Sequence, residues 1–394
     1  MKSILSQRAR ELKPSATLAI SAKEKELKSK GIDVIGFGAG EPDFPTPAHI
    51  REAAKKSLDR GETFYTPVGG IMELKKAVAY RFGQDYGLEY TPDQIVVSCG
   101  AKHSLYNIFQ AIVGPGDEVL VFSPYWVSYP EMIALAGGSA VIVPASEKDK
   151  FLPDPNRVES LITAKTKALL LNSPSNPTGI LYPRPLLEDL AALADKHNLL
   201  VISDEIYDKL LYDRLTFTPF AALPGMKDRT ITVNGVSKSY AMTGLRIGYM
   251  ACTNTQIVKS ATDIQSQSTS NPSNTAQAAA VEALTGSQDE VYRMREIFER
   301  RRDLMVGEIR KIDRISVLKP DGAFYAFVNT SSLCKGSVRD STDVAKYLLE
   351  RHHVACVPGG PFGSDDHIRL SFATGEETIL KGMERIRKAC DELA

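Results

Sequence analysis

Lys238 and Arg246 lie eight residues apart in a glycine-containing segment that follows a run of β-forming residues at 230–233. Turns at strand ends commonly present reactive groups. An unprotonated lysine amine can form a Schiff base with a carbonyl group, and a guanidinium can bind phosphate through two parallel hydrogen bonds. The spacing therefore favours a ligand with both a carbonyl and an anionic group, although a lone turn lysine is more often simply solvated.

Other residues suited to such a ligand follow apolar runs that we predict to be strands. Asp204 ends the run at 199–203, and a carboxylate buried there requires a nearby cation. The remaining candidates are Tyr207, Asn176 in the turn 176–179, the helix start Gly100-Ala101-Lys102, and Trp126, the only tryptophan of the chain. Each has a structural alternative, such as a helix cap, a stiff turn or core packing. Because ligands bind at the carboxyl ends of parallel strands, the whole set supplies the parts that pyridoxal 5′-phosphate requires.

The composition narrows the function further. The 394 residues are 43% hydrophobic and 24% charged, and 48 basic residues balance 48 acidic ones. This profile is typical of a soluble globular protein, and without blocks of like charge it disfavours a nucleic-acid or membrane partner. Five scattered cysteines with no C-x-x-C pair predict neither a disulfide framework nor a metal site. We expect a reduced, cytoplasmic protein.

Apolar runs alternate with helical patterns from residue 95 to residue 251, which predicts a mostly parallel sheet sandwiched by helices. Short strands and helices then alternate toward the C-terminus, with strands expected at 315–318, 324–329, 354–357 and 367–372. We therefore expect an α/β protein with a large domain over residues 47–288 and a smaller α+β domain formed by 1–46 plus 289–394. Gly36 and Gly38 lack the third glycine of a dinucleotide-binding motif, which disfavours an NAD oxidoreductase.

The chain resembles, nearly end to end, the fold-type I aminotransferases of the aspartate aminotransferase family (class I, subgroup Ib), which depend on pyridoxal 5′-phosphate. The order and spacing of seven segments carry the resemblance: Pro14-Ser15-Ala16-Thr17, Ala39-Gly40-Glu41-Pro42-Asp43-Phe44, Pro124-Tyr125-Trp126-Val127-Ser128-Tyr129-Pro130, Asn176-Pro177-Thr178-Gly179, Asp204-Glu205-Ile206-Tyr207, Ser237-Lys238 through Gly248, and Ile368-Arg369-Leu370-Ser371. One position departs from many relatives, because Gly235 stands where they have a phosphate-binding serine.

The resemblance implies a role for each candidate residue. Lys238, Asp204 and Tyr207 would be catalytic, with Lys238 as the Schiff-base lysine and proton shuttle and Asp204 pairing with the ring nitrogen. Residues implied to bind the cofactor are Gly100, Ala101, Lys102, Trp126, Asn176, Asp204, Tyr207, Ser237, Lys238 and Arg246, with Tyr65 reaching the neighbouring subunit of a homodimer. Residues implied to bind substrate are Gly40, Thr17, Lys102, Trp126, Asn176 and Arg369.

The activity implied by the resemblance is aspartate aminotransferase: ping-pong transfer of an amino group between aspartate or glutamate and 2-oxoglutarate or oxaloacetate. Lys102 would pair with the distal carboxylate of the substrate. Thr17 together with Lys102 also resembles enzymes that aminate prephenate, so a glutamate/aspartate–prephenate activity stands as an alternative or second activity. A carbon–sulfur lyase that uses the same cofactor, or a regulatory module that binds it without catalysis, is less favoured.

Overall fold

The structure, a computed structural model, describes residues 4–393. Its larger sheet has seven strands in the order β2-β8-β7-β6-β5-β3-β4. The strands are β2 (Ile95–Ser98), β3 (Glu118–Phe122), β4 (Ser139–Val143), β5 (Thr166–Asn172), β6 (Leu200–Asp204), β7 (Thr230–Gly235) and β8 (Gly248–Ala251). Strand β8 runs antiparallel to β2 and β7, and the other pairs are parallel. The predicted mostly parallel sheet is confirmed.

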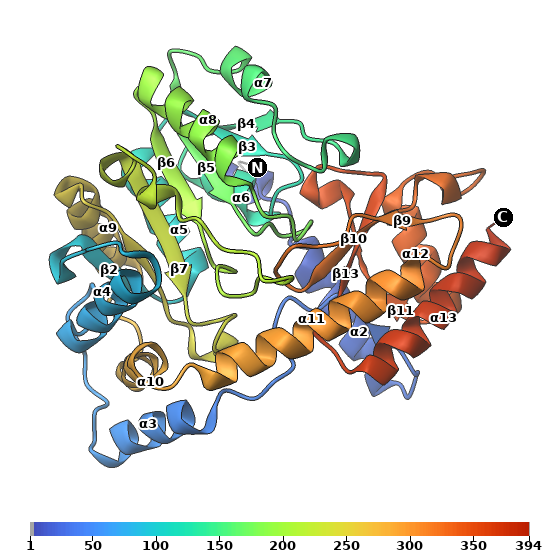
Figure 1. Cartoon of the computed structure of the whole chain (residues 1–394), viewed down its shortest axis with the longest axis horizontal. Coiled ribbons are helices and arrows are strands. Elements are labelled where there is room, and N and C mark those ends of the chain that lie inside the picture. The colour runs from blue at the N-terminus through green and yellow to red at the C-terminus, as the bar shows by residue number, and fades with distance from the viewer. Residues whose placement is uncertain (1–3, 394) are drawn as a thin grey trace.

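Both faces of this sheet are buried, which explains why its strands are continuous apolar runs. In β5, Ala168 and Leu170 pack on one face, while Leu169 and Leu171 pack on the other. The first face is covered by α5 (Ala101–Ile112), α6 (Ser128–Leu135) and α9 (Thr255–Ser268), and the second by α7 (Pro155–Ser160) and α8 (Arg184–Lys196). Helices α3 (Ala48–Asp59), α4 (Met72–Tyr86) and α10 (Asn274–Thr285) surround the β2–β8 end (Figure 1).

A smaller layered unit lies beside the first. Its four-stranded antiparallel sheet has the order β12-β13-β10-β9, with strands β9 (Ser316–Val317), β10 (Tyr325–Asn329), β12 (Val357–Pro358) and β13 (His367–Ser371). A two-stranded parallel pair joins β1 (Ile35–Gly36) to β11 (Val354–Ala355). The helices are α2 (Ala16–Ser29), α11 (Asp289–Ile309), α12 (Ser341–His352) and α13 (Glu376–Glu392). Helix α1 (Gln7–Glu11) buries none of its residues, and Lys13 after it donates its N–H to Glu131 of α6. The strand expected at 354–357 is two short strands, because the chain leaves one sheet at Cys356 and joins the other.

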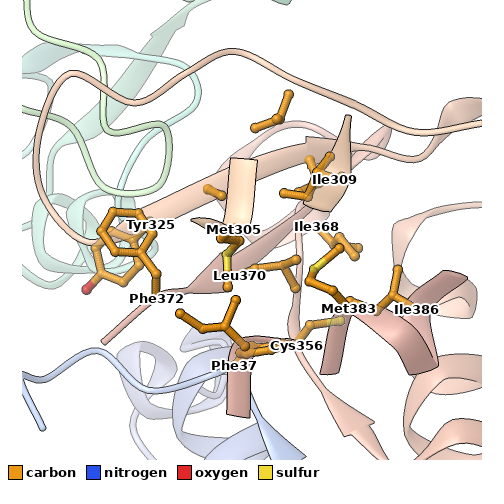
Figure 2. Close-up of a cluster of buried hydrophobic side chains, with 14 of the residues drawn as sticks. Phe37, Met305, Ile309, Tyr325, Cys356, Ile368, Leu370, Phe372, Met383 and Ile386 are labelled. Carbon is orange, nitrogen blue, oxygen red and sulfur yellow. The ribbon is translucent and has the colours of Figure 1, made fainter. Parts of the chain in front are cut away.

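The core of the smaller unit lies between its four-stranded sheet and helices α11 and α13. Figure 2 shows Ile368 and Leu370 of β13 facing Met305, Ile309, Met383 and Ile386, all of them buried. Tyr325 stands at the edge of this cluster, with its hydroxyl directed away from the other side chains (Figure 2). That hydroxyl belongs to the candidate site described below.

Helix α11 connects the two units. Its first turn places Val291 in the cluster around α4 and α10, while Phe298, Met305 and Ile309 lie in the core of the smaller unit. Figure 1 shows the helix running from one unit to the other. We propose the division given by the sequence, 47–288 against 1–46 plus 289–394, since all strands of the seven-stranded sheet fall within 95–251 and β1 pairs with β11.

Short 3-10 helices complete the secondary structure: η1 (Pro92–Gln94), η2 (Glu147–Asp149), η3 (Phe220–Ala222), η4 (Lys227–Arg229), η5 (Thr243–Leu245), η6 (Ser331–Leu333) and η7 (Gly360–Phe362). Across residues 4–393, none of the helices is long and apolar enough to pass through a bilayer. Within the same residues, no cluster of three histidine, cysteine, aspartate or glutamate side chains is arranged to hold a metal ion.

Candidate active site

The carboxyl ends of three adjacent parallel strands bring the main candidates together. Asn172 ends β5 directly opposite Asp204 at the end of β6, and Asp204 lies opposite Val233 of β7. Lys238 follows β7 by three residues. Because ligand sites of open α/β sheets form at this edge, the topology supports the grouping expected from the sequence.

Asp204 is a buried carboxylate with a neutral neighbour. The Tyr129 hydroxyl donates to Oδ2 at 2.7 Å, and the Ile206 N–H donates to Oδ1 at 3.4 Å. Burial raises the pKa of Asp204 to about 6, although these hydrogen bonds and the nearby Lys238 amine oppose the rise. Asp204 forms no ion pair with any residue between 4 and 393. A carboxylate held this way gains from a cation placed against its free side.

Lys238 is half-buried and its amine points into the same space. Nζ donates to the Gly40 carbonyl at 2.6 Å and lies 5.8 Å from the centre of the Phe324 ring. Burial lowers the pKa of Lys238 to about 8, which Arg369 and Arg246 reinforce and Glu41 and Asp204 oppose. A lysine amine with a lowered pKa is more often neutral near physiological pH, and only the neutral amine is nucleophilic.

Arg246 stands at the beginning of α5, where the first helical N–H groups are available to an anion. Its guanidinium donates to the Thr243 carbonyl at 2.9 Å and to the Cys99 carbonyl at 3.4 Å. Two glycines permit the close packing there. A Cβ on Gly100 would lie 2.4 Å from Arg246 Nη2, and a Cβ on Gly248 would lie 2.1 Å from the Ala101 nitrogen. Guanidinium, helix N-terminus and Cβ-free backbone together form an anion site.

Ser237 is buried next to Lys238, and Gly235 explains the departure from the family pattern. A Cβ on Gly235 would lie 3.0 Å from both the Gly248 Cα and the Ile247 carbonyl oxygen. A serine at this position would therefore press against the backbone of β8. In this chain the anion site must rely on Arg246 and the start of α5.

Arg369 is a buried cation on β13 whose partners are neutral. Nη1 donates to Asn176 Oδ1 at 2.9 Å, and Nη2 donates to the Gly38 carbonyl at 3.0 Å. Its guanidinium lies 4.2 Å from the centre of the Tyr325 ring. Nε is buried without a hydrogen-bond partner in the described part of the chain. A buried guanidinium with neutral partners and an unused donor is suited to bind a carboxylate.

The aromatic residues and Lys102 surround this space from two sides. The Tyr207 and Tyr325 hydroxyls lie 3.0 Å apart, and Trp126 packs edge-on against Tyr129 with ring centres 5.2 Å apart. Lys102 Nζ lies 4.8 Å from the Trp126 ring centre. Burial lowers the pKa of Lys102, and Arg246 lowers it further. Lys102 is nevertheless exposed to solvent at the edge of this space, and its charge could be compensated by a second carboxylate.

Two expected site residues are not joined to this group within the single chain. The Thr17 hydroxyl, at the start of α2, lies 3.0 Å from Ser15 Oγ. Tyr65 is 90% exposed, between α3 and α4. Its loop is held by two buried glutamines: Gln265 donates to the Val68 carbonyl at 2.7 Å, and Gln277 accepts from the Ile71 N–H at 2.8 Å. The loop is thus fixed while Tyr65 projects outward.

Three residues of the site carried no assignment from the sequence. Tyr129 lies in the first turn of α6, and its N–H donates to the Trp126 carbonyl at 3.0 Å, in a segment that the sequence had already marked. Asn172 donates to the Asp204 carbonyl at 3.0 Å and accepts from the Asn176 N–H at 2.9 Å; its place at a strand end was visible too. Tyr325 had no local signal, because its role depends on contact between the two units.

Glu205, next to Asp204, is a buried carboxyl group outside the expected set. Oε1 accepts from the Ser203 hydroxyl at 2.8 Å and from the Phe220 N–H at 3.3 Å, while Oε2 is buried without a partner in the described residues. Burial raises the pKa of Glu205 to about 8. The folded protein therefore keeps this carboxyl group protonated at pH values where the unfolded chain has released the proton.

The Glu205→Gln variant should reveal this proton in the pH dependence of stability. In the wild type, the folded state holds a proton on Glu205 that the unfolded state has already released, over the range from its ordinary pKa of 4.5 to about 8. The raised pKa therefore stabilises the fold most at low pH, and this contribution is lost as pH rises to about 8. Glutamine is neutral at every pH. The unfolding temperature of the variant relative to wild type should therefore rise by a few degrees between about pH 5 and pH 8.5. Thermal unfolding measured across this range checks it.

The exposed Glu89 supplies the control for this experiment. Glu89→Gln also removes one carboxyl group, so it should change the unfolding temperature by a similar small amount at each pH. A temperature difference for Glu205→Gln that stays constant with pH would show that Glu205 ionises normally in the folded protein.

Comparison with known proteins agrees with this geometry. A profile described as "Aminotransferase class I and II" matches residues 32–386. The chain is 46% identical to the aspartate/prephenate aminotransferase of Thermus thermophilus over 387 residues, 98% of each chain, and 46% identical to the aspartate aminotransferase of Bacillus subtilis over 386 residues, again 98% of each. Among solved structures, the aspartate aminotransferase of Thermus thermophilus with maleate superimposes with a TM-score of 0.93 at 45% identity, covering 99% of this chain and 100% of that one.

Proposed function

Because the chain belongs to the class I and II aminotransferase family, we propose that it is an aspartate aminotransferase that uses pyridoxal 5′-phosphate. The observation that carries the proposal is that Lys238, whose pKa is lowered, and Asp204, a buried carboxylate without an ion-pair partner in the described residues, lie near each other beyond the ends of β7 and β6. Amino acids and 2-oxo acids would be the substrates. The proposal includes no nucleic-acid or membrane partner.

The residues present fit that cofactor. Asp204 lacks a cation, which a protonated ring nitrogen would supply. The anion site of Arg246, Gly100 and Ala101 suits a phosphate. Asn176 and Tyr207 lie beside Asp204 in the strand-end loops, where they would bond a ring oxygen, and Trp126 offers an aromatic face. When bound, the cofactor supplies an aldehyde for amine exchange and an electron-withdrawing ring.

The chain's own groups would then carry out amino transfer. Lys238 would hold the cofactor covalently and, once an amino acid has displaced its amine, would accept the proton from the substrate Cα as a general base. Asp204 would keep the proton on the ring nitrogen. Arg369, with the Gly40 backbone nearby, would bind the α-carboxylate and orient the Cα–H bond toward Lys238. The two half-reactions share one site, so the kinetics should be ping-pong.

Substrate choice depends on Lys102. Its ammonium group, 4.8 Å from the centre of the Trp126 ring, would bind the distal carboxylate of aspartate or glutamate. A supporting contact from Thr17 stays a prediction, because the Thr17 hydroxyl lies beside Ser15 in the described chain. A second activity toward prephenate, which also carries a side-chain carboxylate, is favoured by the relatives: the proteins of Thermus thermophilus and Cereibacter sphaeroides are both named aspartate/prephenate aminotransferase.

An assay of the purified protein tests this choice. With L-aspartate or L-glutamate as donor, we expect turnover with 2-oxoglutarate and oxaloacetate and measurable turnover with prephenate. Lys102→Met should lower kcat/KM for aspartate by about 10- to 100-fold, since a hydrogen bond to a charged group is lost, and should change kcat/KM for alanine much less. Lys165→Met, at an exposed surface position, is the matched control. An equal fall in kcat/KM for aspartate and for alanine would show that Lys102 does not recognise the side-chain carboxylate of the substrate.

We further propose a homodimer whose two sites are shared between subunits. Phe64 and Tyr65 are 80% and 90% exposed, and Leu58, Met72 and Tyr80 on the adjoining helices are also exposed. An exposed apolar face of this kind is typical of a protein interface, and it would let Tyr65 contact the cofactor phosphate of the other subunit. The five cysteines are free thiols, which supports a location in the cytoplasm.

A further inference from the structure

Glu147 extends from the seven-stranded sheet's unit to three strands of the four-stranded sheet. It begins η2 in the segment between β4 and α7, which lies beside β9 and β10 (Figure 1). Its carboxylate accepts from Asn329 Nδ2 of β10 at 2.5 Å and from Ser316 Oγ of β9 at 3.3 Å. The same carboxylate lies 3.5 Å from His367 Nε2 of β13. One side chain therefore connects the edge of one unit to three adjacent strands of the small sheet, β9, β10 and β13.

His367 links this contact to Arg369. The two residues are separated by one position on β13, so their side chains point to the same face of the sheet. Phe327 of β10 lies directly opposite Arg369 in the strand register and stacks on His367, with ring centres 4.7 Å apart and planes 8° from parallel. Phe362 stands edge-on to Phe327 at 6.1 Å and lies 5.2 Å from the Arg369 guanidinium. Packed rings thus run from the Glu147 contact to the guanidinium.

A second contact from the same turn supports the first. Phe151 packs edge-on against Phe327 at 5.7 Å and against His367 at 5.4 Å. It is brought there by left-handed backbone at both Lys150 and Phe151, with φ of 55° and 56°, a conformation that is uncommon outside glycine. The turn that carries Glu147 is therefore shaped to place one polar and one apolar side chain on β10 and β13.

The Glu147 carboxylate is surrounded by side chains that carry no full positive charge, namely Ser316, Asn329 and a mostly neutral His367. Burial lowers the pKa of His367, which the charges of Glu147 and Asp366 oppose, so the ring is mostly neutral at physiological pH. Ser364 Oγ lies 2.9 Å from His367 Nδ1. His367 Nε2 is buried without a hydrogen-bond partner in the described residues, and the Glu147 carboxylate 3.5 Å away is the acidic group placed against it.

We propose that Glu147 is a positioning residue for Arg369. By contacting Ser316, Asn329 and His367 from the other unit, it fixes the four-stranded sheet, and hence the guanidinium, relative to Lys238. Asn176, which accepts from Arg369, provides a further connection between the units at this place. The inference rests on the proposed function only in taking Arg369 as the site of the substrate carboxylate.

Three variants of the full-length holoenzyme test the proposal. Glu147→Ala removes all three contacts, and Glu147→Gln keeps an amide oxygen that can accept from Asn329. Glu159→Ala is the matched control, because Glu159 likewise contacts a histidine, His197 at 2.9 Å, together with Lys196 at 2.6 Å, but entirely within the large unit.

We expect Glu147→Ala to raise the KM for aspartate and the Kd for maleate about tenfold, with kcat changed less than about threefold. Glu147→Gln should recover most of the lost affinity, and Glu159→Ala should match wild type. Amide hydrogen exchange in residues 325–329 and 367–371 should become faster in Glu147→Ala alone. Wild-type KM, Kd and exchange in Glu147→Ala would overturn the proposal.

The exchange measurement separates this inference from the proposed function. If the wild type shows no amino transfer, the proposed function fails, and the exchange rates still decide whether Glu147 holds β10 and β13. If amino transfer is present and Glu147→Ala changes kcat and KM to the same extent as Glu159→Ala, the proposed function stands and the positioning role does not.

Discussion

Lys238→Ala should abolish amino transfer, with a fall in kcat of at least about 10⁴-fold. The residue is proposed both to hold the cofactor and to move the substrate proton, and its amine has the lowered pKa, about 8, that both tasks need. Alanine removes one hydrogen bond, to the Gly40 carbonyl, so the fold should be retained. Steady-state kinetics, together with loss of the visible absorbance that a lysine–cofactor bond produces, would check the prediction.

Lys238→Arg is the informative companion to this variant. Arginine keeps the positive charge and most of the length, but it cannot lose its proton under physiological conditions. It should therefore be nearly as inactive as the alanine variant while binding cofactor phosphate at the Arg246 site. Substantial activity in either variant would show that another group removes the Cα proton.

Asp204→Asn should lower kcat by about 10²–10⁴-fold, because a buried cation on the cofactor ring would lose about 3–5 kcal/mol of compensation. Asparagine keeps the shape and can still accept the Tyr129 hydrogen bond, which spans 2.7 Å in the wild type. The loss would therefore report the charge alone. Single-turnover kinetics with aspartate, which isolate the proton-transfer half-reaction, are the measurement of choice.

Tyr129→Phe supplies the comparison, since it removes the hydrogen bond and leaves the carboxylate in place. A loss of about tenfold or less is expected from one such hydrogen bond. If Asp204→Asn were no more harmful than Tyr129→Phe, the carboxylate would serve only to orient neighbouring groups.

Much of the large unit was predictable because strands that are buried on both faces consist of continuous apolar runs. The runs expected as strands at 199–203 and 230–233 fall on β6 (Leu200–Asp204) and β7 (Thr230–Gly235). In the small unit, β1, β9, β11 and β12 have two residues each. Two residues are too few for a periodic pattern, so the expected strands at 315–318 and 354–357 mark the right segments without their exact bounds. The break at Cys356 depends on which sheet each half joins, and that is decided by tertiary packing.

The same distinction applies to the site. Lys238, Asp204 and Asn176 could be grouped in advance because each follows a strand that the pattern marks clearly, and parallel strands end at one edge. Tyr325 and Glu147 contact residues more than 100 positions away in the sequence. The sequence around each of them contains no pattern from which these contacts could be predicted. Tyr65 requires a second chain, so its role stays a prediction.

Helix α11 has a consequence for cooperativity. Val291 packs in one core, and Met305 and Ile309 pack in the other. Unfolding of either unit would therefore expose apolar side chains of α11, the helix that also contributes to the core of the other unit. The boundary that we propose at 288/289 would separate the two sheets, while we expect both units to unfold together. A displacement of the small sheet relative to the large one would therefore have to bend or tilt α11, because the helix is packed at both of its ends.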